Sequence, residues 1–149
     1  MRVLIASDGP NITTGYGNIA RALGKYLLRA GGFEVAFASL QQMGDVMYVR
    51  VNGGYIPVYS LYGGQQPYLE RILSEFRADV LIHIRDPVVL VPHMFVGSYR
   101  LKPVASKYGC KVIHWAPLMG EPTVDVVKAL TEDSDYLLTP TRWAYELFL

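Results

Sequence analysis

Cysteine is nearly missing from the sequence, since Cys110 is the only one among 149 residues. A single thiol excludes an internal disulfide and a cysteine-based zinc site. No run of 18 uncharged apolar residues occurs, so no membrane-spanning helix is predicted. The apolar stretch at the start is too short for a secretory signal and is typical of a strand. With 14 Lys and Arg against 13 Asp and Glu, the net charge of +1 argues against a dedicated nucleic-acid-binding protein. These absences favour a cytoplasmic location.

Hydrophobic residues make up 51% of the sequence and charged residues 18%. Disordered chains combine low hydrophobicity with high net charge, so this composition predicts a folded chain. A chain of this length buries about 68–70% of its unfolded surface, which suffices for one core. We therefore expect residues 1–149 to form a single domain.

Five apolar segments rich in β-branched residues alternate with helical patterns. Their nearly continuous apolar character is typical of strands that are covered on both faces. The predicted strands are Val3–Ser7, Glu34–Ser39, Val80–Ile84, Val112–Ala116 and Tyr136–Thr139. Alternation with helices predicts right-handed crossovers. The expected fold class is therefore α/β: a Rossmann-like, doubly wound, mainly parallel sheet with helices on both faces.

Helices are predicted where apolar residues repeat every 3.6 positions. They cover 16–30, a helix from Pro67 to Phe76, an interrupted region over 87–108 with a short helix opening at Pro103, 123–132, and a last helix from Thr139. Val46–Val51 and Tyr55–Tyr59 flank Asn52-Gly53-Gly54, and this turn predicts a small β-hairpin insertion near residues 46–59. The last helical pattern stops within an apolar stretch, so we expect a longer natural chain or a partner surface there.

Polar side chains gather in the loops that follow the predicted strands. Ligands of open α/β sheets bind beyond the carboxyl ends of the strands, where such loops meet. The loops cover residues 7–18, 83–87, 114–122 and 139–142. We therefore expect Gly15, Asp86 and His114 to lie on the same side of the molecule.

The segment Gly15-Tyr16-Gly17-Asn18-Ile19-Ala20 has the spacing G-x-G-x-x-A. Glycines at this spacing let the backbone approach a pyrophosphate at the start of a helix. The match to a dinucleotide site is weak, because a long loop replaces the tight turn and Ala38-Ser39-Leu40 brings no acid to the end of the second strand. A wide turn with close helix packing is the structural alternative.

Three histidines, His83, His93 and His114, raise the question of a metal site. Their spacing fits no helix-borne pair and no carboxylate set supports one, so we expect no metal and no cofactor. His83 lies among strand residues and is predicted to be a hydrogen-bonded core histidine. His114 ends its strand ahead of Pro117, which favours a functional role.

Charged and aromatic residues leave further alternatives open. Arg85-Asp86 is either a salt-bridged loop anchor or part of a ligand pocket. Tyr16 and Trp115 are core aromatics or stack on a sugar ring. A run of bases without an intervening acid is usually a solvated face, and contact with anionic lipid at the inner face of the membrane is the alternative. That run consists of Arg100, Lys102, Lys107 and Lys111.

The order of these motifs resembles the N-terminal half of GT-B-fold retaining glycosyltransferases of the group 1, or family 4, type, over all 149 residues. The stretches that carry the resemblance are Met1–Ser7 with the glycine loop at 15–17, the helix end and strand start at 27–35, Ala78–Pro87, which is similar to D-V-(L/V)-H-x-H-x-P, 111–117, and 134–141. Two departures are that Tyr16 separates glycines that are adjacent in the family and that Phe33 replaces its histidine.

The resemblance implies that this domain binds the acceptor, a sugar, lipid or glycan. A C-terminal domain absent from this chain would bind the nucleotide-sugar donor, and transfer with retention would occur in the cleft between them. His114 is implied to be catalytic. The implied substrate-binding residues are Gly15, Tyr16, Gly17, Arg85, Asp86 and Glu121. The donor motif E-x7-E is missing, so the chain alone is expected to be inactive.

Two other functions fit the same sequence. One is a stand-alone Rossmann-like module that binds a nucleotide or phosphate ligand without catalysis. The other is an interaction protein whose apolar C-terminal end docks to a partner subunit. The pattern selects no particular sugar, nucleotide or oligomeric state.

Overall fold

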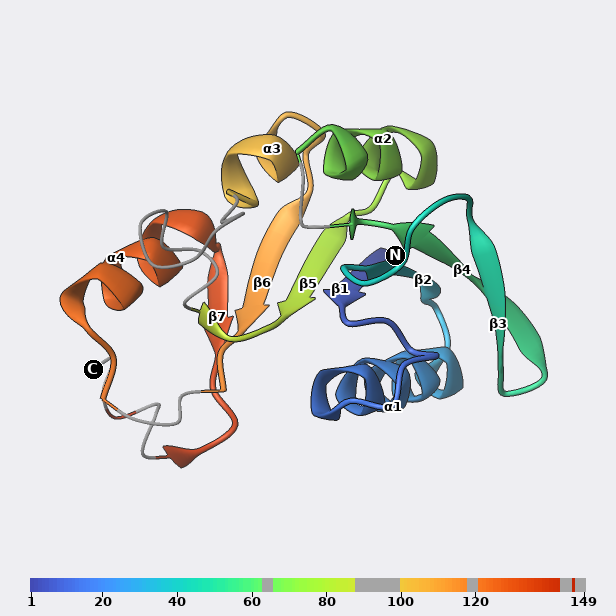
Figure 1. Cartoon of the computed structure of the whole chain (residues 1–149), viewed down its shortest axis with the longest axis horizontal. Helices are drawn as coiled ribbons and strands as arrows, with labels where there is room; N and C mark the ends of the chain where they lie inside the picture. The colour runs from blue at the N-terminus through green and yellow to red at the C-terminus, as the bar shows by residue number, and fades with distance from the viewer. Residues whose placement is uncertain (63–65, 88–99, 118–120, 143–145, 147–149) are drawn as a thin grey trace.

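The structure, a computed structural model, describes residues 1–62, 66–87, 100–117, 121–142 and 146. Strands and helices alternate along these residues (Figure 1). The strands are β1 (Arg2–Ser7), β2 (Glu34–Ser39), β3 (Met47–Val51), β4 (Gly54–Ser60), β5 (Val80–Ile84), β6 (Lys111–Trp115) and β7 (Tyr136–Leu138). The helices are α1 (Gly15–Ala30), α2 (Gln66–Phe76), α3 (Lys102–Ser106) and α4 (Val124–Asp133).

The strands form one sheet in the order β3-β4-β2-β1-β5-β6-β7. All neighbours are parallel except β3 and β4, which form an antiparallel hairpin at one edge (Figure 1). Asn52 and Gly53 make its turn with φ of 52° and 84°, the left-handed backbone that a two-residue hairpin requires. The predicted mainly parallel sheet and its hairpin insertion are therefore confirmed.

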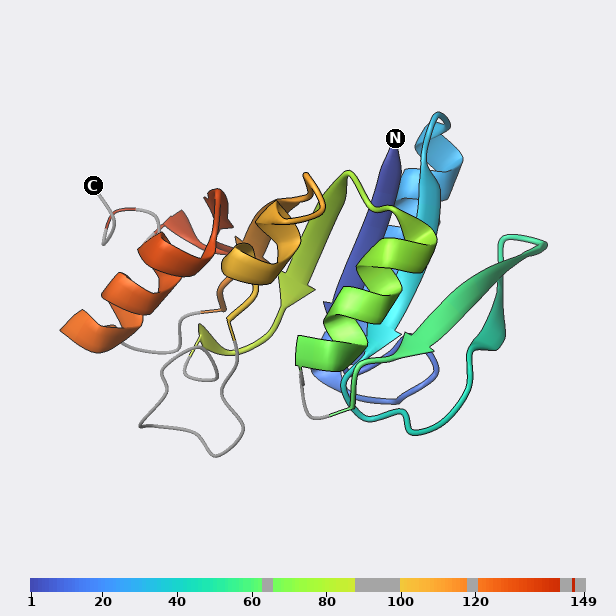
Figure 2. The same cartoon turned by 90° about the horizontal axis from the view of Figure 1, so that it is seen from above.

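Helices cover both faces of the sheet, as predicted: α1 lies on one face, and α2, α3 and α4 lie on the other (Figure 2). Side chains alternate between the faces along each strand, so every strand supplies apolar residues to both cores. The core under α2, α3 and α4 includes Leu4, Ala6, Ala36, Leu81 and Val112. The core under α1 includes Val3, Ile5, Val35, Phe37, Ile82 and Ile84.

Helix α1 begins and ends at residues that suit those positions. The Thr14 side chain caps its first turn by accepting a hydrogen bond from the Gly17 N–H at 3.0 Å. Gly31 closes it with a φ of 75°, a conformation that favours glycine. In its middle, Gly24 lies against the buried ring of Phe37 on β2, and a Cβ there would lie 2.5 Å from the ring's Cζ atom. Gly24 thus lets α1 approach the sheet closely.

The other predicted elements differ little from the observed ones. Helix α4 follows Thr123, whose hydroxyl accepts from the Val126 N–H, and α3 carries Pro103 in its first turn. Most of the expected helical region 87–108, with His93, lies outside the described residues, as does most of the expected last helix. In the described part of the chain, no helix is long and apolar enough to cross a membrane.

The four bases of the predicted basic run are each paired with an acid from another part of the fold. The ion pairs are Arg100–Asp133 at 3.1 Å, Lys102–Asp135 at 3.7 Å, Lys107–Glu70 at 3.2 Å and Lys111–Asp135 at 3.5 Å. These pairs join α2, α3, α4 and β6 and set three acids against the four bases. The interpretation as part of the folded surface is therefore favoured, and lipid contact gains no support.

Asp133 is the buried member of these pairs. Its carboxylate accepts hydrogen bonds from the backbone N–H groups of Leu101 at 2.8 Å and Lys102 at 3.2 Å, and so holds the start of α3. Burial raises the pKa of Asp133, and these hydrogen bonds and Arg100 oppose the rise. The last residue of α4 therefore anchors α3 against the sheet.

We expect Gly24→Ala to lower the free energy of unfolding by about 1 kcal/mol. Overpacking against Phe37 costs about 1–3 kcal/mol, and the better helix propensity of alanine offsets up to about 1 kcal/mol. Urea denaturation measures the change. The matched control is Gly15→Ala in the same helix, where a Cβ would meet no atom within 4 Å. Equal stability of the two variants would contradict the close approach of α1.

Asp135→Asn should lower the stability at neutral pH by about 1 kcal/mol. The Val112 N–H, 2.9 Å from the carboxylate, and the nearby Lys111 and Lys102 lower the pKa of Asp135. A lowered carboxyl pKa stabilises the fold above the unfolded pKa of about 3.9, and this stabilisation is lost as the pH falls through the folded pKa. Denaturation should therefore show a difference that shrinks below about pH 4. The exposed Asp45→Asn serves as the control.

Candidate functional site

The topological switch point of the sheet lies between β1 and β5. From β1 the chain adds β2 and β4 on one side, then returns through α2 to place β5 on the other side of β1. The loops after β1 and β5 thus lead away from each other, and ligands of such sheets bind in the crevice between them. Asp8 directly follows β1 and Arg85 directly follows β5. Both sides of the switch point therefore carry a charged residue.

Asp8 and Arg85 form an ion pair across this point. The guanidinium Nη1 of Arg85 donates to Oδ1 of Asp8, and the two side chains are 24% and 6% exposed. The Thr14 hydroxyl donates to the other carboxylate oxygen, Oδ2, at 2.9 Å. Both oxygens of this buried carboxylate are thus satisfied, as burial of a charge requires.

The first loop is tied to its neighbours by further polar contacts. The Ser39 hydroxyl, at the end of β2, donates to the Asp8 carbonyl at 2.9 Å. The Thr14 hydroxyl donates to Asp8 and also accepts from the Gly17 N–H. A single side chain therefore caps α1 and joins that helix start to the switch point.

The two glycines of the G-x-G-x-x-A segment have different surroundings. A Cβ on Gly17 would lie closer than 3.0 Å to the backbone carbonyl oxygens of Gly9 and Ile12, whereas a Cβ on Gly15 would meet no atom within 4 Å. Gly17 therefore serves close packing of the loop on the helix. Gly15 is exposed and leaves open space at the helix start.

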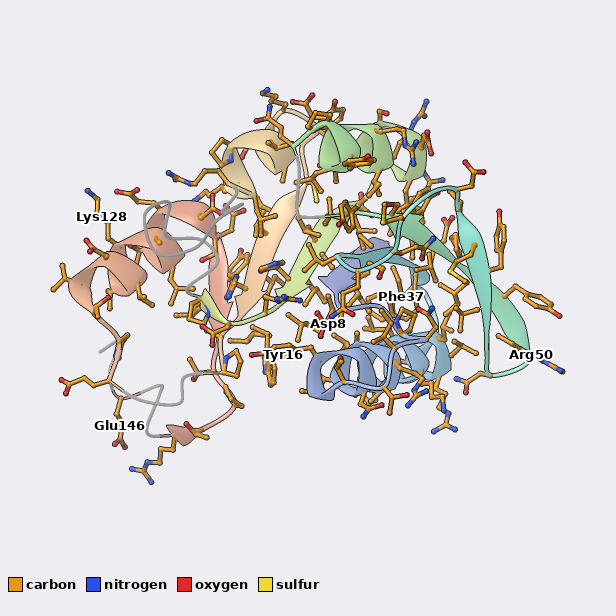
Figure 3. The ribbon with its side chains drawn as sticks, in the orientation of Figure 1. Asp8, Tyr16, Phe37, Arg50, Lys128 and Glu146 are labelled. Atoms are coloured by element: carbon orange, nitrogen blue, oxygen red, sulfur yellow. The ribbon has the colours of Figure 1, made fainter. Side chains whose placement is uncertain are left out.

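Tyr16 lies between this helix start and the loop after β5. Its ring centroid is 6.0 Å from the guanidinium carbon of Arg85, within the range of a cation–π contact. Burial raises the pKa of Tyr16, and the charge of nearby Asp86 adds to the rise. Figure 3 shows Asp8 and Tyr16 near the amino-terminal end of α1. Arg85 is thus held by a carboxylate from the first loop and an aromatic ring from the first turn of α1.

Two histidines face each other in the core, one on β5, the strand that leads to Arg85, and one on the neighbouring strand β6. His83 on β5 and His114 on β6 are register partners, and their Nδ1 atoms are 2.9 Å apart. The Nε2 atom of His114 lies 3.2 Å from the Arg85 carbonyl oxygen. Both side chains are fully buried. The prediction of a hydrogen-bonded core histidine at position 83 is confirmed, and His114 shares that environment.

Burial keeps this pair uncharged near neutral pH. Burial lowers the pKa of His114 to about 4. It also lowers the pKa of His83 well below its usual value, and the nearby charges of His114 and Arg85 lower that pKa further. A neutral imidazole has one N–H donor and one acceptor nitrogen. The described contact of His114 toward the site is the one to the Arg85 backbone.

The sequence-predicted site residues gather at one edge with one exception. Tyr16 lies against Arg85 and near Asp86, and Gly15 and Gly17 flank Tyr16 at the start of α1. The His114 ring contacts the Arg85 carbonyl. Glu121 is exposed beyond β6, and none of the hydrogen bonds described above involves it.

Sequence reasoning missed the residues that hold Arg85 in place. These are Asp8, which pairs with Arg85; Thr14 and Ser39, which hold Asp8; and His83, the partner of His114. The position of an acid directly after the first strand was the available signal for Asp8. Among the described residues, no group of three or more His, Cys, Asp or Glu side chains could hold a metal ion.

Comparisons with known proteins address the fold. No protein-family model and no curated protein matches the chain. UDP-glucose 4-epimerase from Thermus thermophilus, solved with NAD, superimposes with a TM-score of 0.55 and 21% identity over 83% of this chain and 41% of its own. UDP-GlcNAc 2-epimerase from Methanocaldococcus jannaschii does so with a TM-score of 0.53 and 18% identity over 99% and 42%. A wide-type short-chain dehydrogenase/reductase from Veillonella parvula, solved with NADP, superimposes with a TM-score of 0.54 and 12% identity. The match covers 93% of this chain and 67% of that protein.

These likenesses establish the class of fold, a Rossmann-like α/β domain, and so confirm the predicted fold class. The chain spans about two-fifths of the length of the two epimerases. A shared fold at such low identity carries no chemistry with it.

We expect Asp8→Ala to lower the free energy of unfolding by about 3 kcal/mol, because Arg85 and Thr14 both lose a buried acceptor. Denaturant unfolding of Asp8→Ala, Arg85→Met and the double variant should show a coupling above about 1 kcal/mol. The control cycle combines Asp8→Ala with Arg21→Met, at an exposed position of α1. The effects of these two changes should be additive. Additivity of positions 8 and 85 would contradict a structural role for the ion pair.

Proposed function

We propose that this chain is the acceptor-side domain of a glycosyltransferase that takes its sugar from a nucleotide-sugar donor. The observation that carries the proposal is the convergence of the Arg85 guanidinium and the open start of α1 at the switch point. The resemblance of the sequence to the N-terminal half of GT-B-fold enzymes supplies the reaction class. Sugar-nucleotide enzymes among the structures with this fold are consistent with it.

The charges at this edge suit an anionic diphosphate. A helix N-terminus presents free N–H groups and a partial positive charge, and the first turn of α1 carries no acid. Arg85 has five N–H donors, and the Asp8 contact engages Nη1. Gly15 leaves room for a phosphate to approach the backbone. Arg85 and the N–H groups of α1 would bind the donor phosphates or a charged acceptor.

The neighbouring side chains suit a sugar. The ring of Tyr16 is half-buried and can stack on a pyranose face. The half-buried Asp86 can accept hydrogen bonds from sugar hydroxyls. Glu121, which is exposed beyond β6, would join them. We assign this group to the acceptor side of the cleft.

Transfer with retention passes through a transition state with positive charge on the sugar and negative charge on the leaving phosphate. Groups that bind these charges more tightly than the ground state accelerate the reaction. Arg85 and the α1 N-terminus would stabilise the leaving phosphate, so the proposed chemistry needs no metal. A C-terminal domain would hold the nucleotide, and this chain alone would not turn over.

A stand-alone nucleotide-binding module is the second candidate. It is favoured by the G-x-G-x-x-A spacing at the start of α1 and by NAD and NADP in structures that share the fold. Two features weaken it. Strand β2 ends at Ser39, where a ribose-binding site would have an acid. The space beside Gly17 is occupied by backbone carbonyl oxygens of the preceding loop.

The test uses the full protein that the gene encodes, assayed for transfer of labelled sugar from UDP-glucose or GDP-mannose. Gly15→Ala should lower kcat/KM about tenfold, or about 1.4 kcal/mol, with an unchanged melting temperature, because a Cβ there obstructs only a ligand. Ser74→Ala, on the exposed face of α2, is the control. No transfer with either donor, together with saturable binding of NADH to residues 1–149, would favour the second candidate instead.

A further inference from the structure

We propose that His83 and His114 form a buried positioning pair that fixes the Arg85 peptide and thereby aims its guanidinium at the switch point. The inference deepens the proposed function, and its consequence for transfer rests on it. It gives His114 a role through Arg85 in place of the catalytic role that the resemblance implies.

The pair is created by strand register. His83 and His114 are opposite each other on adjacent parallel strands, so their side chains leave the sheet on the same face. That face is the one covered by α2, α3 and α4, since Leu81 and Val112, two positions earlier, belong to its core. The rings are tilted by 49° with centroids 4.7 Å apart. A shift of either strand by one residue would separate them.

The hydrogen bonds define which nitrogen carries each proton. The Arg85 carbonyl can only accept, so Nε2 of His114 is the donor in that contact. A neutral His114 then has an unprotonated Nδ1, which must accept from the Nδ1–H of His83 at 2.9 Å. The donors therefore run in one direction, from His83 to His114 to the backbone of Arg85.

This chain of donors ends where the sheet ladder ends. The pairing of β5 with β6 stops at Ile84 and Trp115, and Arg85 is the next residue. The N–H of His114 holds the Arg85 carbonyl beyond that point, where the sheet no longer dictates the backbone. At its other end, Arg85 is held by Asp8 and lies against Tyr16. The residue is thus fixed at both its peptide and its guanidinium.

Two polar imidazole rings in the core are costly, and a positioning role explains why they are there. Two apolar side chains could fill the space among Leu81, Val112 and Ala116, which are all buried, without the cost of burying imidazole groups. A half-satisfied buried network is worse than an apolar core. Here the two rings bond to each other and present one donor to the Arg85 carbonyl, which matches a positioning role.

Nitrogen-15 NMR of histidine-labelled protein at neutral pH tests the proton assignment directly. Two-bond correlations should show His114 as the Nε2–H tautomer and His83 as the Nδ1–H tautomer, which is the less common form in solution. His93→Gln assigns the third histidine. The Nε2–H form at His83, or a charged imidazolium at either residue, would overturn the proposal.

Two amide variants of His114 separate its two bonds. Glutamine places an N–H near the position of Nε2 and can still donate to the Arg85 carbonyl. Asparagine places its amide near the position of Nδ1 and can pair only with His83. The Nε–H signal of Arg85 should therefore stay near its wild-type shift in His114→Gln and move in His114→Asn. In the full protein, kcat should fall at least tenfold in His114→Asn and less in His114→Gln.

The readouts distinguish this inference from the proposed function. The tautomers and the Arg85 signal are measured without ligand, so a correct tautomer pattern in a protein that transfers no sugar would contradict only the function. Reversed behaviour of the Arg85 signal in the two variants would overturn the positioning role. If neither variant folds, the tautomer pattern of the unaltered protein alone decides.

Discussion

A buried carboxylate at the switch point is the constraint from which the site follows. Asp8 directly follows the central strand β1, in a position where its charge must be paired, because an isolated buried charge costs far more than a marginally stable domain can tolerate. Arg85 and Thr14 supply the partners. Since Thr14 also caps α1, one carboxylate sets the position of a strand end, a helix start and a cation.

Much of the scaffold could be predicted because its causes are local. Apolar segments that are covered on both faces predicted the strands, and the Asn52-Gly53 pair predicted the hairpin because it tolerates the positive φ found there. The gathering of loop residues at one edge also follows from topology, since parallel strands all end on the same side. The sequence therefore predicted the edge at which Tyr16 and Arg85 meet.

The partners within the site could not be predicted, because they depend on register between distant segments. Asp8 and Arg85 are 77 positions apart, and His83 meets His114 only because β5 and β6 pair without a one-residue shift. The different surroundings of Gly15 and Gly17 depend on how the loop folds back on the helix. The basic run was interpreted without its acids, since Asp133 and Asp135 lie far along the chain.

Because the fold is shared by different enzymes, the reaction is determined by the side chains at the carboxyl edge of the sheet and by the groups that face this edge. Epimerases and a dehydrogenase have the same scaffold, so the arrangement of strands does not select among reactions. The groups at this edge remain partly open: Arg85 is 24% exposed and Gly15 has no neighbour within 4 Å of a Cβ. Electrostatic stabilisation of a transition state is strong only where water is excluded. A half-open edge that carries an arginine therefore suits one wall of a cleft, and in the proposed transferase the second wall is a domain that closes over the donor.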